Sequence, residues 1–346
     1  MGLWAVARGP PSEGTEGKMP GKGHDHYIQI GREAVWGTDV AATRRLNVVS
    51  TDMGPVFGKV RSDTITAARN RAQILLGPGF GRASIEVDAL FTSQLHLWDA
   101  AFGTATYAAD GGTMAGVGPY VWTFKQRALF NSYTIEGVTN IPAGKADQLV
   151  GAKLNRFRFS GSTGLDAKPC RLATEWIGKT WSDNVTPTGA LTATTPISVM
   201  PGHIDTAALD VGTADAAGLG RLKSFEFAID NKLTDDRYYG AATMDEPLTD
   251  DYAETTCKWA MEFTSNAALD EYIANTAGNP TIKFAQSANV YIQFAMGAGY
   301  IVTPVNRPIN RWGILTQEFG YEAVDDGGSP STGLTVTIST TEATIS

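Results

Sequence analysis

The stretch Ile85–Ser93 reads Ile-Glu-Val-Asp-Ala-Leu-Phe-Thr-Ser, and the stretch Cys257–Ser265, 172 residues further on, reads Cys-Lys-Trp-Ala-Met-Glu-Phe-Thr-Ser. Both alternate apolar with mostly polar residues, which is the pattern of a β-strand buried on one face. Each is followed by a helix-like segment, at 94–103 and at 266–275. A repeat of this length indicates a duplicated domain rather than the short unit of a solenoid.

The same offset holds further along the chain, where two more apolar series with period two lie opposite each other. They are Tyr120, Trp122 and Phe124 in the first half and Ile292, Phe294 and Met296 in the second. Chance is the alternative explanation, because the halves share few identical residues, but the shared periodicity favours duplication. We therefore expect an extended arm at 1–27, a first β domain at 28–185, a linker at 186–220 and a second β domain at 221–346.

The composition indicates a folded, mainly β protein. Apolar residues make up 42% and charged residues 18% of the 346 residues, and glycine occurs 38 times. No apolar stretch is long enough to span a membrane, and residues 1–23 lack the continuous apolar core of a signal peptide. We expect a neighbouring subunit to hold the Gly- and Pro-rich arm, because it has too few apolar residues to fold alone.

The formal net charge of −8 argues against affinity for nucleic acid, which requires basic patches. It is compatible with a passage through which nucleic acid moves without binding. The two cysteines, Cys170 and Cys257, lie in different halves and in strand-like stretches. We expect both to be buried free thiols.

Several other segments carry strand or helix patterns. Residues 155–160 predict a strand with two arginines on its outer face, 121–124 and 130–136 predict a pair of strands, and 334–339 predict a last strand whose uncharged outer face favours pairing. The residues expected to face inward from the two helices are Leu95, Trp98 and Phe102 in the first, and Leu269, Tyr272 and Ile273 in the second.

No group of residues requires an enzyme, so we expect no catalytic, cofactor or metal site. Gly178-Lys179-Thr180 resembles the end of a phosphate-binding loop, but Ala173 stands where the first glycine belongs, and the segment has a strand pattern. His24, Asp25 and His26 supply too few ligands for a closed metal site. The remaining candidates are better explained as loop or core residues: Asp235-Asp236, Asp250-Asp251, Asp325-Asp326, His96 and His203.

A series of segments resembles the tail tube (major tail) proteins of long-tailed, siphovirus-like bacteriophages. The resemblance covers most of residues 28–340 and rests on segments in a fixed order: Gly31–Thr38, the strand and helix that end at Gly103, Tyr120–Phe124, Lys153–Gly161, Trp176–Lys179 and Leu222–Asn231. The chain departs from shorter, single-domain members in its doubled length.

The resemblance implies two tandem β-barrel or β-sandwich domains, each with a short flanking helix. It implies a virion protein, assembled in the host cytoplasm, that forms stacked rings around a channel for genome ejection. The doubled length favours rings of three with pseudo-six-fold symmetry, with rings of six as the alternative. The implied partners are further copies of the chain, a tape measure protein and DNA in the lumen, and tail terminator and distal tail proteins at the ends. No cofactor and no membrane binding are expected.

The acidic charge balance predicts a negatively charged lumen that DNA passes without binding. Four carboxylates occupy polar-facing positions of the best strands and are the candidates for lining it: Glu86, Asp88, Glu226 and Glu262. Two other readings stay open. One is a different virion β-protein, such as a distal tail or decoration protein. The other, which the sequence favours less, is a β-sandwich that binds glycans.

Overall fold

The computed structural model describes most of the chain from His26 onward. The described residues are 26–61, 74–103, 105–109, 119–126, 130–139, 144–164, 167–189, 191, 197–211, 222–234, 243–263, 265–305, 315–324 and 333–345. The arm expected at 1–27 therefore lies almost wholly outside the described residues.

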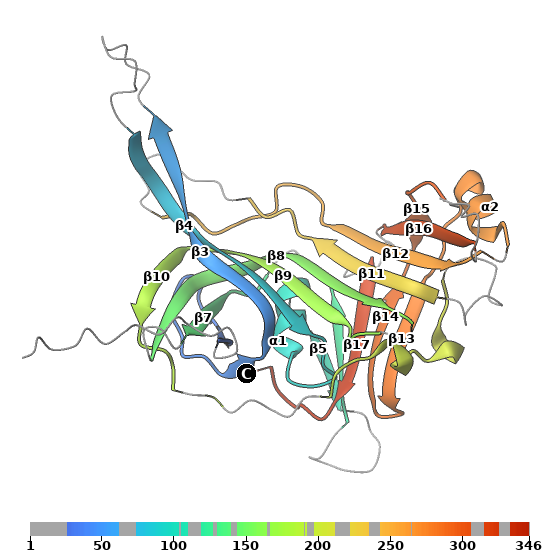
Figure 1. Ribbon diagram of the computed structural model, residues 1–346, viewed down its shortest axis with the longest axis horizontal. Helices are drawn as coiled ribbons and strands as arrows, with labels where there is room; N and C mark the ends of the chain where they lie inside the picture. The colour runs from blue at the N-terminus through green and yellow to red at the C-terminus, as the bar shows by residue number, and fades with distance from the viewer. Residues whose placement is uncertain are drawn as a thin grey trace, which may run out of the picture.

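The main structural element is an open row of eight antiparallel strands (Figure 1). Their order is β3 (Val48–Arg61), β4 (Ile74–Asp88), β9 (Arg171–Gly178), β8 (Lys145–Ser162), β11 (Leu222–Asp230), β12 (Glu254–Glu262), β16 (Thr316–Ala323) and β15 (Gly299–Ile301). The row passes from the first half of the chain to the second where β8 pairs with β11.

The long strand β8 also belongs to a branch of the same sheet. Its first residues pair with β7 (Tyr133–Thr139) on one side and with β10 (Thr180–Val185) on the other. Strand β7 then pairs with β1 (Tyr27–Arg32), which pairs with β2 (Arg44–Leu46). Among the described residues this branch has no counterpart in the second half.

A second sheet of five strands mixes strands from the two halves. Its order is β13 (Thr281–Ser287), β14 (Val290–Met296), β17 (Leu334–Thr340), β6 (Tyr120–Lys125) and β5 (Thr106–Ala109). Strand β17 is central, as its uncharged outer face predicts. The expected pairing of 121–124 with 130–136 is wrong, because β6 pairs with β5 and β17 while β7 pairs with β1 and β8.

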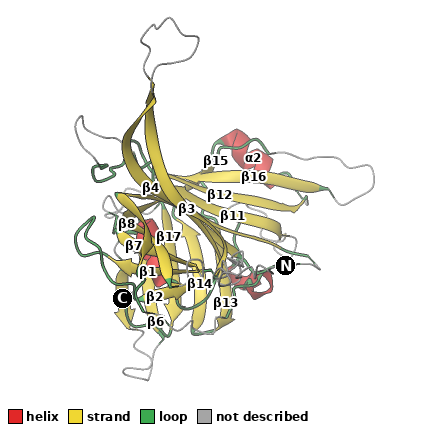
Figure 2. Cartoon of the chain, turned by 60° about the vertical axis from the view of Figure 1, so that its left-hand side comes forward, coloured by secondary structure: helices red, strands yellow, loops and turns green. Residues whose placement is uncertain are grey.

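Two α-helices and two short 3₁₀ helices complete the described elements. Helix α1 (Leu95–Phe102) lies inside the body, whereas α2 (Ala267–Ala274) lies at its far end beside β15 and β16 (Figures 1 and 2). Gly103 ends α1 with a φ of 87°, a backbone conformation that glycine tolerates. The 3₁₀ helices are η2 (Pro201–His203) and η3 (Thr206–Ala208).

One apolar core joins the two halves between the sheets. Ile85, Val87, Ala89 and Phe91 are buried as the alternation predicts, and Trp98 contacts Phe294 across the halves with ring centroids 5.6 Å apart. The fold is mainly β and is a sandwich. Within the described ranges no sheet closes into a barrel. The expected domains thus share both sheets and a core, and their boundaries stay a prediction.

The two halves of the eight-strand row have the same strand order. In each, a hairpin comes first (β3–β4 or β11–β12), followed by a helix and a hairpin of the second sheet. A further hairpin, β8–β9 or β15–β16, then lies again in the eight-strand row. Its second strand pairs with the second strand of the first hairpin, so β9 pairs with β4 and β16 pairs with β12. The offset is 172 residues between the helices (Leu95 against Ala267) but 147 between β9 and β16 (Thr174 against Tyr321), because β7 and the first part of the long β8 have no described counterpart in the second half.

The first hairpins differ in length. Strands β3 and β4 have 14 and 15 residues and project beyond the sandwich, whereas β11 and β12 have nine each (Figure 2). The β11–β12 connection packs at the base of the long hairpin, where Leu233 and Met244 meet Phe80 and Ile177. The described part of the expected linker, 186–220, also packs against the body, with Val199 fully buried.

Candidate functional site

One face of the eight-strand row is polar and charged, because alternate residues point away from the core. Glu86, Asp88, Glu226 and Glu262, the four expected acidic residues, all lie on this face. The register shows it: Glu86 is opposite Ala173, Ala173 is opposite Arg158, and Arg158 is opposite Ala228, two residues from Glu226. The structure therefore brings the four carboxylates onto one continuous surface.

Cations on this face lie beside carboxylates of neighbouring strands. Arg171 on β9 contacts Asp88 at 2.9 Å and Glu86 at 4.0 Å. Glu226 on β11 lies between Lys258 on β12, at 3.4 Å, and Arg158 on β8, at 3.7 Å. These pairs are substantially exposed, so each contributes about 0–1 kcal/mol to stability and acts mainly by setting the local charge.

Arg156 makes a similar bridge across three strands. It contacts Glu175 on β9 at 3.7 Å and Asp230 on β11 at 3.0 Å. Burial acts to raise the pKa of Asp230, but hydrogen bonds from Lys232 and the charge of Arg156 outweigh it, so the pKa lies below its ordinary value. Asp230 therefore stays ionised at neutral pH.

Within the strands of the row, carboxylates outnumber exposed cations on this face by ten to five, and Lys232, just after β11, adds a further cation that contacts Asp230 and Glu254. The carboxylates are Asp52, Glu86, Asp88, Glu175, Glu226, Asp230, Glu254, Glu262, Glu318 and Glu322. The cations are Arg82, Arg156, Arg158, Arg171 and Lys258. Lys153 also points this way but is buried, and its Nζ donates to Glu246 at 2.7 Å. The face is thus net acidic.

The sequence identified four of these carboxylates and missed six. Glu175, Glu254, Glu318 and Glu322 lie at alternate positions of shorter or less regular apolar patterns, and Asp52 lies on a strand with no clear alternation. Asp230 is the last residue of the clearly alternating strand β11, next to a turn, and was not counted among the candidates. The signal that could have found them is the same period of two, applied to every strand rather than to the best ones.

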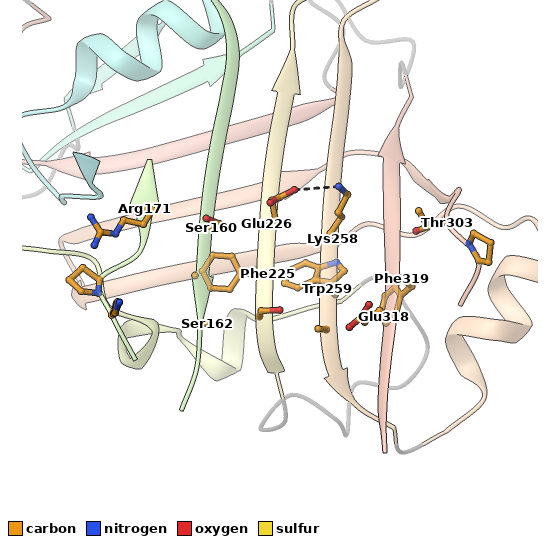
Figure 3. A pocket seen from close by; sticks show the side chains of 16 residues that line it. Ser160, Ser162, Arg171, Phe225, Glu226, Lys258, Trp259, Thr303, Glu318 and Phe319 are labelled. Atoms are coloured by element: carbon orange, nitrogen blue, oxygen red, sulfur yellow. Dashed lines mark hydrogen bonds and ion pairs between the residues drawn. The ribbon is translucent and has the colours of Figure 1, made fainter. Parts of the chain in front are cut away.

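Small side chains hollow the charged face at one end of its central strands (Figure 3). Ser160, Ser162 and Ala260 contribute to the hollow, which has a volume of about 630 Å³. Glu226 and Lys258 face each other at its border.

The eight-strand row has an open edge at each end. Strand β3 pairs only with β4 among the described strands. Strand β15 pairs with β16, and on its other side the described residues add one bridge, from Gly278 to Gly299. Exposed edges of this kind are templates for pairing with another chain.

The two α-helices lie in matching places on the core side of the eight-strand row, but they differ in how many of their residues are buried. Every residue of α1 is buried, and Trp98 packs on Phe157 of β8 with ring centroids 4.9 Å apart. In α2 only Ala268 is buried and Leu269 is partly exposed. The expectation that Tyr272 and Ile273 face inward is wrong, since they are 38% and 71% exposed.

Each helix carries a carboxylate bonded to a tyrosine, and the two carboxylates are 172 residues apart. Tyr133 Oη donates to Asp99 at 2.6 Å, and Tyr321 Oη donates to Glu271 at 3.0 Å. Burial raises the pKa of both carboxyls, and the tyrosine bonds oppose it. Asp99 also accepts a hydrogen bond from Asn131, whereas Glu271 is partly exposed to solvent.

The motifs that the sequence analysis singled out lie in strands, in the core or in exposed turns of the fold. Gly178-Lys179-Thr180 lies where β9 passes into β10, with Lys179 in the bend between the two strands. Cys170 and Cys257 are buried free thiols, as expected. His96 is buried, His203 packs beside Phe91, and Asp250-Asp251 is an exposed turn. His24, Asp25, Asp235-Asp236 and Asp325-Asp326 lie outside the described residues.

The described part of the chain contains no group of three or more His, Cys, Asp or Glu side chains that could hold a metal ion. None of its helices is long and apolar enough to cross a membrane.

Comparison with known protein families gives one match. Comparison with curated proteins finds no match. The family model described as "Phage tail tube protein" matches residues 23–339, nearly the whole chain, including all eight strands of the charged row and both α-helices. A structural virion component is consistent with a mainly β chain whose prominent features are a charged sheet face and open strand edges. The chain belongs to the phage tail tube protein family.

Proposed function

We propose that the chain polymerises into stacked rings of three copies, which form the tail tube of a long-tailed phage and enclose a channel for DNA. The observation that carries the proposal is the eight-strand row, in which one four-strand order occurs twice, head to tail, between two open edges. Such a row extends by adding the next copy in the same orientation. A closed ring leaves no edge unpaired.

The internal repeat supports three copies per ring. Each copy supplies two similar four-strand units, so three copies supply the six units of a pseudo-six-fold ring. Eight strands from each of three copies make a barrel of 24 strands. Barrels of 16–18 strands already enclose an aqueous channel, so a barrel of this size leaves room for a large cargo. A ring of six copies is the alternative.

The charged face is the proposed channel wall. With the core on its other side, it is the surface of the row that remains in water, except where the β11–β12 connection covers Phe80 and Ile177. Its carboxylates repel phosphate over about 8–10 Å at physiological salt, which keeps DNA from binding as it passes. Glu86, Asp88, Glu226 and Glu262 belong to this wall. A tape measure protein occupies the channel before DNA, and terminator and distal tail proteins bind the ends of the tube.

Electron microscopy of the purified full-length chain tests the assembly. The proposal expects tubes with a central channel, built of stacked rings. Particles that stay single at every concentration would overturn it. Isolated rings that never stack would instead favour the alternative of another virion β-protein, such as a distal tail or decoration protein.

Charge reversal tests the channel wall. Wild-type tubes should retain no DNA. A variant with lysine at Glu86, Asp88, Glu226 and Glu262 should bind DNA, with an affinity that falls steeply as salt rises. The control places lysine at three exposed acids outside the strands of the row, Asp39, Asp183 and Asp210. Equal DNA retention by the two variants would contradict this assignment of the wall.

A further inference from the structure

The junction between the two halves gives a template for a contact between copies. Inside the chain, β8 at the end of the first four-strand unit pairs antiparallel with β11 at the start of the second. The equivalent strands at the two open edges are β15, which ends the second unit, and β3, which starts the first. If neighbouring units always meet in one way, β15 of one copy pairs with β3 of the next.

The repeat also fixes the register of that contact. Phe157 and Ile301 occupy equivalent positions, since Phe157 is opposite Thr174 of β9 and Ile301 is opposite Tyr321 of β16. Strands β9 and β16 align in turn through β4 and β12, where Ile85 is opposite Thr174 and Cys257 is opposite Tyr321.

Strands β3 and β11 align in the same way. Ile85 is opposite Thr51, and Cys257 is opposite Phe227. Phe227 therefore corresponds to Thr51, and Ala228 corresponds to Asp52. Because Arg158 is opposite Ala228 within the chain, its equivalent, Val302, should lie opposite Asp52 of the next copy.

A groove lies along the open edge of β3 at these residues. It has a volume of about 470 Å³ and is lined by residues 48–53 with His26 and Asp147. Two buried polar atoms that line it, Thr51 Oγ1 and His26 Nε2, have no hydrogen-bond partner among the described residues. Buried polar groups are normally satisfied, so the groove has the character of a surface that another chain completes.

Helix α2, beside β15, exposes two large apolar side chains, Tyr272 and Ile273, which are called here the apolar surface of α2. They are 38% and 71% exposed. In the first half the equivalent region around α1 is covered by the second half, where Phe294 packs on Trp98. The corresponding cover for α2 would come from the first half of another copy.

We propose that β15 of one copy adds to the edge of β3 in the next copy, with Val302 opposite Asp52, and that the next copy's first half covers the apolar surface of α2. This inference rests on the proposed function, and it names the partner as a second copy of this chain and the contact as head to tail. Charge does not oppose the contact, because Val302 adds an uncharged side chain beside Asp52.

Disulfide trapping tests the register. Within the chain, Asn231 N donates to Asn155 O and Thr163 N donates to Lys223 O, so the Arg158–Ala228 pair between them is a non-hydrogen-bonded pair. Cα atoms in such pairs lie about 4.5 Å apart, which is close enough for a disulfide. A V302C chain mixed with a D52C chain, assembled and then mildly oxidised, should give a cross-linked dimer. Both native cysteines are buried, so they should not interfere.

A shifted pair is the matched control. Gly54 lies on the same face of β3, two residues from Asp52, with nothing near its Cβ position, so G54C fits without strain. Diagonal neighbours are about 7–8 Å apart, beyond disulfide reach. V302C with D52C should cross-link at least tenfold faster than V302C with G54C. Equal rates, or no cross-link in assembled tubes, would overturn the proposed register.

The apolar surface has its own test. Ile273→Asp should abolish ring formation while the chain stays folded, and Ile273→Val should assemble normally. Leu248→Asp is the control, because Leu248 is 67% exposed on the β11–β12 connection, away from α2. Tubes of I273D with wild-type yield would overturn the role of α2. If wild-type chain forms no rings, the proposed function fails; if wild-type chain forms rings but both tests fail, this inference alone fails.

Discussion

Helices α1 and α2 occupy matching places in the two halves, yet one is fully buried and the other buries only Ala268. The sequence reflects the difference: Trp98 and Phe102 of α1 correspond to Asp270 and Ala274 of α2 at the 172-residue offset. The first helix is a core element because the second half covers it. The second lies at an end of the row, where only another copy could cover it. The position of a helix along the repeat, rather than its local fold, therefore determines how much of it is buried within one chain.

The largest expected difference between the helices is in the free energy of unfolding. Trp98→Ala should cost about 3–5 kcal/mol, because it empties a fully buried aromatic site that packs on Phe157 and Phe294. Leu269→Ala should cost less than about 1.5 kcal/mol, since Leu269 is partly exposed. Urea unfolding of the unassembled chain measures both. Similar losses of unfolding free energy in the two variants would contradict the expected difference between the helices.

The tyrosine–carboxylate pairs should differ in the same direction. Tyr133→Phe should cost about 1.5–3 kcal/mol, because it removes a buried hydrogen bond to Asp99 where water cannot replace it. Tyr321→Phe should cost about 0.5–1.5 kcal/mol, because Glu271 remains within reach of water. The midpoints and slopes of urea unfolding compare them. A larger loss for Tyr321→Phe would show that α2 is the more tightly held helix.

The smallest expected effect is a pH dependence at Glu271. Burial raises its pKa, the hydrogen bond from Tyr321 opposes this, and the charge of Asp210 adds to it. The ionised carboxylate therefore destabilises the folded chain above the raised pKa, and this cost disappears as pH falls through the raised pKa to the ordinary one. Glu271→Gln should be at least as stable as wild type at pH 7, and the difference in free energy of unfolding should shrink toward pH 4. A difference that grows as pH falls would contradict the expected direction of the pKa shift.

Much of the local structure was predictable, because alternation reports which face of a strand is buried. Ile85, Val87, Ala89 and Phe91 face the core, and Glu86, Asp88, Glu226 and Glu262 share the opposite face. The pairing of β6 with β17 was not predictable, since it joins residues more than two hundred positions apart and depends on how the halves pack. Period alone identifies an apolar surface but not what covers it, which explains the error at Tyr272 and Ile273.

The central claim is that contacts between copies repeat the contact between halves, with three chains in each ring. The most direct measurement is a reconstruction of the assembled tube by electron microscopy, at a resolution that separates strands. The account predicts three chains per ring and a wall of 24 strands in which β15 of each chain pairs with β3 of the next. Six chains per ring, or a wall in which these two edges do not meet, would contradict it.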